Sequence, residues 1–471
     1  MPDTVHLLKN CVEMLRSNKQ IVIPNHLVQK HNLPSALVKL DHLDQLCRFQ
    51  ADMKWKLAPK LNEDLLKIEH FDKMRVHNAT DVFNPRVAAA LKFLSFTHCG
   101  EPGMRTTAWF ISTFVQWFKI VSSRTPMFGL GKKNPEAFQA AMGLFDLVLD
   151  LFQNMKVGNP AEWKPVQTGV KASTLVLKDL VRVYLEEVGF DFFLAGRTTN
   201  DLCENCFSYI RIGNPRPSPL QFKRRLRTLC VSQFMKTIGK SSYDLDDRTD
   251  LINLLHSENA PIPEDLLAAP PISSTEEEDE EETILTFLSL DVESGLPIMP
   301  EKEKYVFYRV CGYVLFKLFK ESHVLSECVN CLDACSHKGG EPHKYALLLR
   351  MTNFKENCLF EVSNEVFELL VKVEELITAV QPSLSKLKTD VIEFLEEKVC
   401  TVEIPPQLKL DCHPNAAKEV IHRYIRFRFR YFSDRPSEER KVPHSADMSS
   451  LSSGSRYLAK RYKAPVRRTR K

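Results

Sequence analysis

Apolar residues recur with helical spacing along most of this chain, and this pattern limits the folds that it can adopt. Residues 35–160 contain several such stretches, including SALVKLDHLDQLCRF and NPRVAAALKFLSF, and residues 165–236 and 284–400 continue the pattern. A period of 3.6 residues predicts amphipathic helices, because positions three and four apart share one face. Glycine is scarce, at 16 of 471 residues, which is about half its usual share. We therefore predict a mainly α-helical protein.

The composition is typical of a globular protein with several domains. Apolar residues make up 44% and charged residues 26% of a chain long enough for two to four domains. We find no run of about 18 apolar residues, so we expect no transmembrane helix, and the first ten residues lack the apolar core of a signal peptide. The 13 cysteines lie mostly in apolar periodic segments, which predicts reduced core thiols of an intracellular protein. The net charge of +4 is too small to indicate a nucleic-acid partner by itself.

Two segments differ in composition from the helical regions. Residues 241–283 are rich in proline and contain the acidic run Glu276–Glu282, and residues 433–471 end in RYLAKRYKAPVRRTRK. Neither segment can bury enough apolar surface to offset the entropy of the chain, so we predict a disordered linker and a disordered basic tail. The tail suits a nuclear localisation signal, a DNA anchor or simply a solvated end. Upstream, Asn84 and Pro85 predict a helix start, with an N-cap followed by proline in the first turn.

The segment NDLCENCFSYIR, residues 200–211, offers two candidate pairs for chemistry. On a helix, Cys203 and Cys206 share a face with the following Phe and Ile, and Asp201 and Glu204 lie on the opposite face. A zinc site needs two further ligands, and a thioredoxin-like motif would follow a strand; this segment offers neither. We therefore interpret the cysteines as core thiols. By pattern alone, the two acids are typical of a solvated face.

Two other motifs allow two interpretations each. Cys328, Cys331, Cys335 and His337 are four soft ligands within ten residues, which suits either tetrahedral zinc or core cysteines at a helix turn. In HRYIRFRFRYFSDR, residues 422–435, arginines and aromatic residues fall on two faces of a helix. The arginines of that face are Arg423, Arg426 and Arg430, and the aromatic residues are Tyr424, Phe427 and Tyr431. This helix either contacts phosphates through its arginines or docks on its own domain.

The acid segment and its continuation NPRPSPLQFKRRLRTLC resemble P-element-type DNA transposases, which include the THAP-domain transposases. That family carries Gln-Asp-x-x-Glu-Asn/His-x-Phe, then an Arg and a Pro-x-x-x-Gln-Phe segment. Further family motifs occur in family order: DTVHLLKN, KLNEDLLKIEHFDKMRVHNATDVFNPRVAAAL, TTAWFISTFVQWFKIVSSR and WKPVQTGVKAST. The resemblance covers residues 3–236.

The resemblance implies an RNase H-like nuclease interrupted by a helical GTP-binding insertion. Acids of such a nuclease hold two Mg²⁺ ions, which activate the attacking hydroxyl and stabilise the leaving oxygen. Asp3 matches the second catalytic acid and Glu204 the third, so both are expected to bind Mg²⁺ and to lie close together. The positions implied for nucleotide binding are Lys60, Arg75, Val76, Lys119, Ser122 and Asp201. The basic residues after the acid motif, expected to contact DNA phosphates, are Lys223, Arg224, Arg225 and Arg227.

The sequence departs from the family pattern in three respects. The strand with the first catalytic Asp and the THAP zinc finger do not precede Asp3 in this sequence, and the guanine-reading Asp-x-x-Asn is replaced by Lys119 and Ser122. We therefore expect no cut-and-paste activity from the chain as given, and a loss of preference for GTP.

These inferences lead to a fold and a domain order. We expect a mainly α protein with a helical insertion domain, an incomplete RNase H-like α/β remnant and a helical C-terminal region. The expected domains are an RNase H-like remnant (1–30), the insertion domain (31–160), the C-terminal part of the RNase H-like domain (161–240), the linker (241–283), a helical C-terminal domain (284–432) and the tail (433–471).

The leading functional hypothesis is a nuclear, DNA-binding transposase fragment with a degenerate GTP site. DNA is the expected partner, with GTP and a second copy of the chain as further candidates, and no membrane partner is expected. The alternative is a domesticated helical protein-interaction module without DNA or metal chemistry, and a third reading is an incomplete form of an active enzyme. Phosphate contacts make DNA binding strongly dependent on salt, which distinguishes the first two hypotheses.

Overall fold

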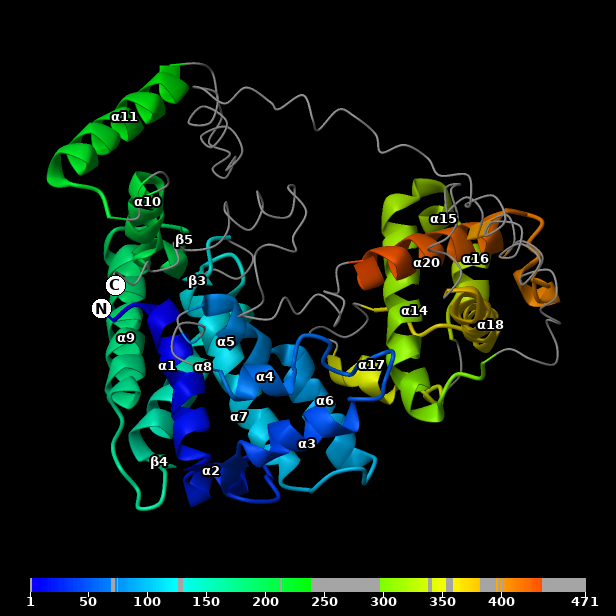
Figure 1. The fold of residues 1–471 in the computed structure, drawn as a ribbon, viewed down its shortest axis with the longest axis horizontal. Coiled ribbons are helices and arrows are strands. Elements are labelled where there is room, and N and C mark those ends of the chain that lie inside the picture. Colours follow the sequence, from blue (N-terminus) through cyan, green and yellow to red (C-terminus); the bar gives the residue numbers. More distant parts are fainter. Residues whose placement is uncertain are drawn as a thin grey trace, which may run out of the picture.

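The computed structural model describes residues 2–238 and 297–433, except 69–72, 74, 126–129, 212–213, 215, 338–340, 353–358, 382–394, 397–398 and 400–401. Its helices form an N-terminal group and a C-terminal group that lie beside each other (Figure 1). None of the helices in this described part combines the length and the apolar character needed to cross a membrane.

The N-terminal group contains most of the described helices. They are α1 (Thr4–Asn18), α2 (Asn25–Lys30), α3 (Asp41–Phe49), α4 (Glu63–Leu66), α5 (Val76–Val82), α6 (Pro85–Phe96), α7 (Met104–Val121), α8 (Pro135–Asn154) and α9 (Pro165–Arg182), which continues as the π-helix η2 (Val183–Glu187). The 3₁₀ helix η3 (Ala195–Thr198) and the helices α10 (Asp201–Arg211) and α11 (Pro219–Ile238) follow. Both α10 and α11 project from this group (Figure 1).

Helix α7 forms the centre of the N-terminal group. Its Phe110, Phe114 and Trp117 are fully buried, and Phe114 contacts the ring of Phe152 from α8 with 5.7 Å between centroids. The neighbouring helix α6 begins as predicted, because the Asn84 side chain accepts a hydrogen bond from a backbone amide of the first turn and proline follows it.

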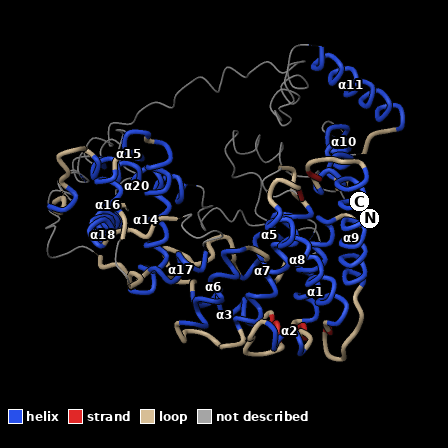
Figure 2. Tube along the Cα trace, turned by 180° about the vertical axis from the view of Figure 1, so that it is seen from behind, coloured by secondary structure: helices blue, strands red, loops and turns tan. Residues whose placement is uncertain are grey.

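The described strands are short and lie at the edges of the helical group (Figure 2). Strand β1 (Gln20–Val22) pairs antiparallel with β2 (Leu37–Lys39) on one side and with β4 (Lys156–Val157) on the other. A second pair joins β3 (Leu130–Gly131) to β5 (Phe192–Phe193). Because the described residues are mostly helical, the predicted mainly α fold class is confirmed. The assignment of an RNase H-like remnant and the domain boundaries stay predictions.

The C-terminal group is built around α14 (Glu301–Glu321). Its other helices are α15 (His323–Glu327), α16 (Val329–Cys335), α17 (Ala346–Thr352), α18 (Asn364–Val380), η6 (Pro406–Leu408) and α20 (Ala416–Ser433). Aromatic contacts join it to the N-terminal group, with 5.6 Å between the ring centroids of Trp55 and Phe307. The predicted linker, residues 241–283, and the tail after Ser433 lie outside the described residues.

Candidate nucleotide and nucleic-acid sites

Asp3 lies where the start of α1 meets the start of α10. Its carboxylate accepts a hydrogen bond from the His6 amide at 3.1 Å and thereby caps α1. The Asn200 amide, just before α10, donates to the other carboxylate oxygen at 3.4 Å. The chain therefore brings Asp3 to the beginning of the acid-bearing helix across almost 200 residues of sequence. The side chains of Asp201 and Glu204 lie outside the described residues, so the meeting of Asp3 with Glu204 stays a prediction.

Lys119 and Ser122 lie in the last turn of α7 and at its C-cap. The Ser122 hydroxyl donates to the Phe118 carbonyl at 2.6 Å, and burial lowers the pKa of the Lys119 ammonium. A cation is favourable in this turn because the last carbonyls of a helix carry partial negative charge. The structure therefore shows Lys119 and Ser122 as residues that stabilise the end of α7, and their role at the guanine-reading positions stays a prediction.

The end of α7 contacts the segment that leads into α10. The Gly196 amide of η3 donates to the Ser123 carbonyl at 2.9 Å. A Cβ atom at Gly196 would lie 2.5 Å from the Ser122 carbonyl oxygen and 2.8 Å from that of Ser123. Only glycine permits this approach of two backbone segments without a shift. The implied nucleotide positions on α7 and the acid helix α10 are thus joined through Gly196.

We expect Gly196→Ala to lower the free energy of unfolding by about 1–3 kcal/mol, because the added methyl group must push two main-chain segments apart. Gly143→Ala is the matched control, since a Cβ atom there meets nothing within 4 Å. Gly143 lies inside α8, so the control is expected to stabilise the helix by about 0.5–1 kcal/mol. Urea unfolding of both variants checks the difference, and equal stabilities would contradict the close approach.

Of the other implied nucleotide positions, Arg75 and Val76 lie at the start of α5, and Lys60, which precedes α4, pairs with a residue of α5. The Lys60 ammonium lies 3.5 Å from the Asp81 carboxylate, and 70% of its side chain is exposed. Arg75 is exposed at the N-cap of α5, and Val76 is the first residue of that helix. Their meeting with Lys119 and Ser122 in one pocket stays a prediction.

A cavity of about 570 Å³ lies on the side of α7 that faces the C-terminal group. Ser112 and Gln116 of α7 line it, together with the cations Arg86, Lys92 and Arg309. Burial lowers the pKa of the Lys92 ammonium. Positively charged side chains in a cleft attract anionic ligands, so the chemistry of this cavity suits a phosphate-bearing molecule.

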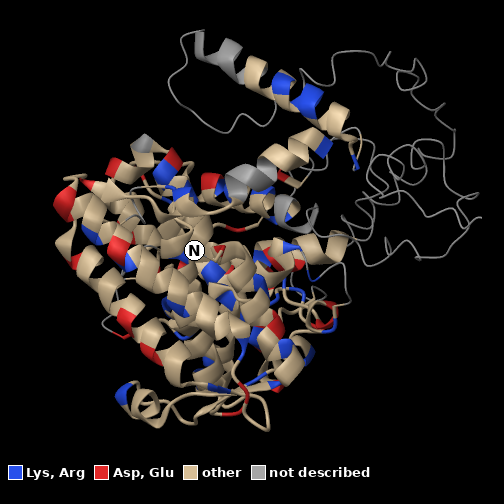
Figure 3. Cartoon of the chain, turned by 90° about the vertical axis from the view of Figure 1, so that its left-hand side faces the viewer, with Lys and Arg blue, Asp and Glu red and all other residues tan. Residues whose placement is uncertain are grey.

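Helix α11 is held against α10 by one of its predicted DNA-contacting residues. The Arg225 guanidinium donates to the Ile210 carbonyl at 2.9 Å, and the rings of Phe207 and Phe222 lie 6.3 Å apart. Arg225 therefore has a structural contact that the sequence analysis did not foresee. The other three predicted residues, Lys223, Arg224 and Arg227, are exposed, and basic positions mark this projecting helix in Figure 3.

The predicted buried stripe on α10 is only partly correct. Ile210 is 1% exposed, but Phe207 is 45% exposed and Cys206 is half-buried. The Phe207 ring packs against Phe222 of the projecting helix α11, and this contact leaves almost half of its side chain exposed. The Cys203 side chain lies outside the described residues.

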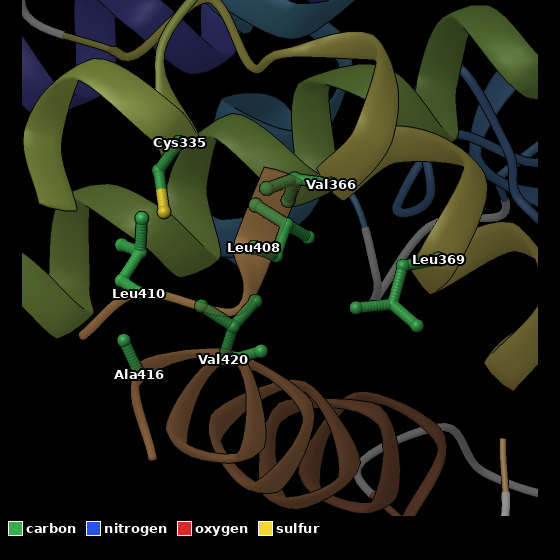
Figure 4. Close-up of a pocket in the computed structure, with 8 residues that line it drawn as sticks. Cys335, Val366, Leu369, Leu408, Leu410, Ala416 and Val420 are labelled. Carbon is green, nitrogen blue, oxygen red and sulfur yellow. The ribbon is translucent and has the colours of Figure 1, made fainter. Parts of the chain in front are cut away.

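The predicted zinc ligands are corrected in two of four positions. The Cys335 side chain points among Leu408, Leu410 and Val420 (Figure 4), and burial raises the pKa of its thiol to about 11. The His337 Nε2 atom lies 2.9 Å from the Glu341 carbonyl oxygen. Cys328 and Cys331 instead meet two residues that the sequence analysis missed, Cys412 and His413.

Helix α20, which contains most of the Arg-aromatic motif, docks on its own group. Tyr424 is fully buried and Arg428 is 3% exposed, and Arg423 forms an ion pair with Glu321 of α14. The docking interpretation accounts for these residues. The side chains of Arg430 and Tyr431 lie outside the described part.

Comparisons with known proteins relate part of the chain to a family of known sequences. Residues 5–135 match the family model described as "TNP-like, GTP-binding insertion domain". The Transposable element P transposase of Drosophila melanogaster is 24% identical over 239 residues, which are 49% of this chain and 30% of that protein. Over part of its length, the chain is related to P-element-type transposases. The resemblance found from the sequence is therefore confirmed.

The P-element relationship covers only a part of each protein. A solved Drosophila P element transposase strand transfer complex matches 49% of this chain and 51% of that chain, with 19% identity and a TM-score of 0.41. This chain spans less than a third of the curated P transposase. The match to the P-element-type insertion domain contains Lys60, Arg75, Val76, Lys119 and Ser122, whereas Asp201 and Glu204 follow it.

Proposed function

We propose that this chain is a nuclear DNA-binding protein of P-element transposase type, and that α11 contacts DNA phosphates. The observation that carries the proposal is the orientation of the cations on α11. Phe222 and Arg225 face α10, whereas Lys223, Arg224 and Arg227 are exposed on the remainder of the helix. Three cations on one projecting helix can neutralise phosphates without a rearrangement of the fold.

We expect a Lys223→Ala, Arg224→Ala and Arg227→Ala triple variant to bind duplex DNA more weakly and with less dependence on salt. The slope of log K against log[salt] changes by about 0.9 for each phosphate neutralised, so the loss of three contacts reduces the slope by about 2.7. Fluorescence anisotropy with a labelled duplex at several salt concentrations measures both quantities.

The matched control removes three other exposed lysines, through Lys30→Ala, Lys156→Ala and Lys418→Ala. Both variants lose the same charge, so the control separates local contacts from an effect of net charge. A slope that falls equally in both variants would contradict a DNA contact by α11.

One observation favours the alternative, a module that binds another protein. Leu220 is 58% exposed and Val231 is 50% exposed on the same helix. Apolar side chains on a projecting helix suit a partner helix. Absence of salt-dependent DNA binding in the natural chain would favour this alternative.

We further propose that the insertion domain binds nucleotide phosphates with little preference for guanine. The cations of the cavity beside α7, with Lys60 and Arg75, support phosphate affinity, and Lys119 and Ser122 oppose guanine recognition. Magnesium binding by Asp3 and Glu204 stays a prediction, because the Glu204 side chain lies outside the described residues. We therefore derive no magnesium-dependent step for this chain.

A further inference from the structure

We propose that Cys328, Cys331, Cys412 and His413 bind one zinc ion that fastens the start of α20 to the turn between α15 and α16. Their four ligand atoms lie within 4.8 Å of one another. Three thiols and one imidazole form a complete tetrahedral ligand set, which is typical of a structural zinc site. This site is independent of the DNA and nucleotide proposals above.

The separations of the ligand atoms suit a shared metal ion better than a disulfide. The Cys412 sulfur lies 3.7 Å from the Cys328 sulfur and 3.8 Å from the Cys331 sulfur. In a tetrahedron with Zn–S bonds of 2.3 Å, the sulfurs lie about 3.8 Å apart, whereas a disulfide bond measures about 2.05 Å. The Cys331 sulfur and the His413 Nδ1 atom lie 3.2 Å apart, close to the corresponding S–N separation of about 3.6 Å.

The backbone of the first two ligands forms a turn suited to metal binding. Cys328 ends α15 and precedes α16 in an extended conformation, and Cys331 lies in the first turn of α16. The Cys331 amide donates a hydrogen bond to the Cys328 sulfur. Such an amide bond orients the sulfur and stabilises negative charge on it.

The other two ligands come from the segment between η6 and α20. Leu408 and Leu410, just before Cys412, anchor this segment in the apolar cavity beside Cys335 (Figure 4). Cys331 is fully buried, whereas Cys412 is exposed, so the site lies at the edge of the core and is accessible to a metal ion.

The ion would close a loop of about 80 residues between Cys331 and Cys412. Loop closure of this length limits the entropy of the unfolded chain, and the free energy of binding becomes free energy of folding. The zinc site would thereby fix the start of α20, the helix that carries the buried Tyr424 and Arg428.

The test measures zinc in the full chain after dialysis against buffer without metal, by inductively coupled plasma mass spectrometry. We expect about one zinc per natural chain, and almost none in Cys412→Ser or Cys328→Ser. Neither sulfur belongs to the fully buried core, so serine is expected to be tolerated there. Cys99→Ser is the control, because Cys99 is an exposed thiol of the N-terminal group, and it should retain the ion.

Cobalt(II) added to the metal-free chain provides a second measurement. Tetrahedral thiolate coordination gives intense visible absorption, which should be present in the natural chain and in Cys99→Ser and be lost in Cys412→Ser. A chelator should lower the melting temperature of the natural chain but not that of Cys412→Ser. Zinc retained in both ligand variants, a natural chain that folds and binds no zinc, or a Cys328–Cys412 disulfide in protein kept under reducing conditions would each overturn the proposal.

Discussion

A Glu374→Ala variant is expected to lose about 3–5 kcal/mol of unfolding free energy, because it leaves the buried Arg428 and the partly buried Lys54 without this counter-ion. The Glu374 side chain is 2% exposed. One of its carboxylate oxygens lies 2.8 Å from Arg428 Nε, and the other lies 2.8 Å from Lys54 Nζ. The Tyr424 hydroxyl also donates to this carboxylate. Removal of the carboxylate therefore affects three partners together.

The partners of Glu374 come from both helical groups, so the loss of stability should involve both groups. Lys54 belongs to the N-terminal group, whereas Arg428 lies on α20 of the C-terminal group. The Arg428 guanidinium also lies over the Trp55 ring, 5.8 Å from its centroid. We therefore expect Glu374→Ala to weaken the contact between the two groups as well as α18 and α20.

Glu368→Ala is the matched control on the same helix, because Glu368 is exposed. A surface substitution of this kind usually changes stability by less than about 0.5 kcal/mol. Guanidinium unfolding followed by circular dichroism compares the two variants. Losses of similar size would show that the buried network contributes little.

The contribution of Glu374 to the free energy of unfolding should also depend on pH. Burial by itself raises the pKa of Glu374, but Arg428 and Lys54 outweigh burial and hold the pKa below its ordinary value. A depressed folded-state pKa contributes stability above the unfolded-state pKa of about 4.3, and this contribution is lost as pH falls through the folded-state value. The natural chain should thus lose more stability on acidification than Glu374→Gln.

The sequence could predict those parts of the fold that depend on local patterns. The helical period indicated the mainly α fold, and Asn84 and Pro85 indicated the start of α6, because both signals arise from residues close together in the chain. The sequence placed Cys328 and Cys331 in a candidate ligand set with Cys335 and His337, and the structure retains only the first two in the Cys-His cluster. The other half of the cluster, Cys412 and His413, is an adjacent Cys-His pair about 80 residues later, which spacing alone does not connect to the first pair.

Tertiary contacts decide several environments that local sequence patterns do not reveal. Glu374 belongs to a helical segment with several acids, and only tertiary packing buries this one beside Lys54 and Arg428. Phe207 fits an apolar stripe, yet it packs against Phe222 of α11 and stays almost half exposed. Arg225 looks like its basic neighbours in the sequence, but the neighbouring carbonyl of Ile210 accepts its hydrogen bond. In each case the packing of other helices, which the local pattern does not encode, decides the environment of the side chain.

The second large effect is expected in nucleotide selectivity, where we predict that Lys119→Asp with Ser122→Asn raises the preference for GTP over ATP at least tenfold. Guanine presents N1–H and an amino group as donors, and a carboxylate accepts both, whereas a lysine ammonium has donors only. One charge-assisted hydrogen bond contributes about 1.5–3 kcal/mol, and about 1.4 kcal/mol corresponds to tenfold in affinity. Isothermal titration calorimetry with GTP and ATP measures the change.

The structure predicts that this double variant is less stable than the natural chain, and it offers a matched control on the same helix. Lys119 lies in the last turn of α7, where an aspartate opposes the helix dipole by about 0.3–1 kcal/mol, so the variant should be slightly less stable even as its selectivity rises. Gln116→Asp adds a carboxylate to the same helix about one turn earlier, at an exposed position that lines the cavity beside α7, and should leave the ratio of GTP to ATP affinity unchanged because it does not occupy a base-reading position. An added carboxylate repels nearby phosphates in either variant. Both variants should therefore lose some affinity for ATP, and only the double variant should recover affinity for GTP.

Tight, GTP-selective binding by the natural chain would show that guanine is recognised by other residues, and the assignment of Lys119 and Ser122 to the base-reading positions would then be wrong.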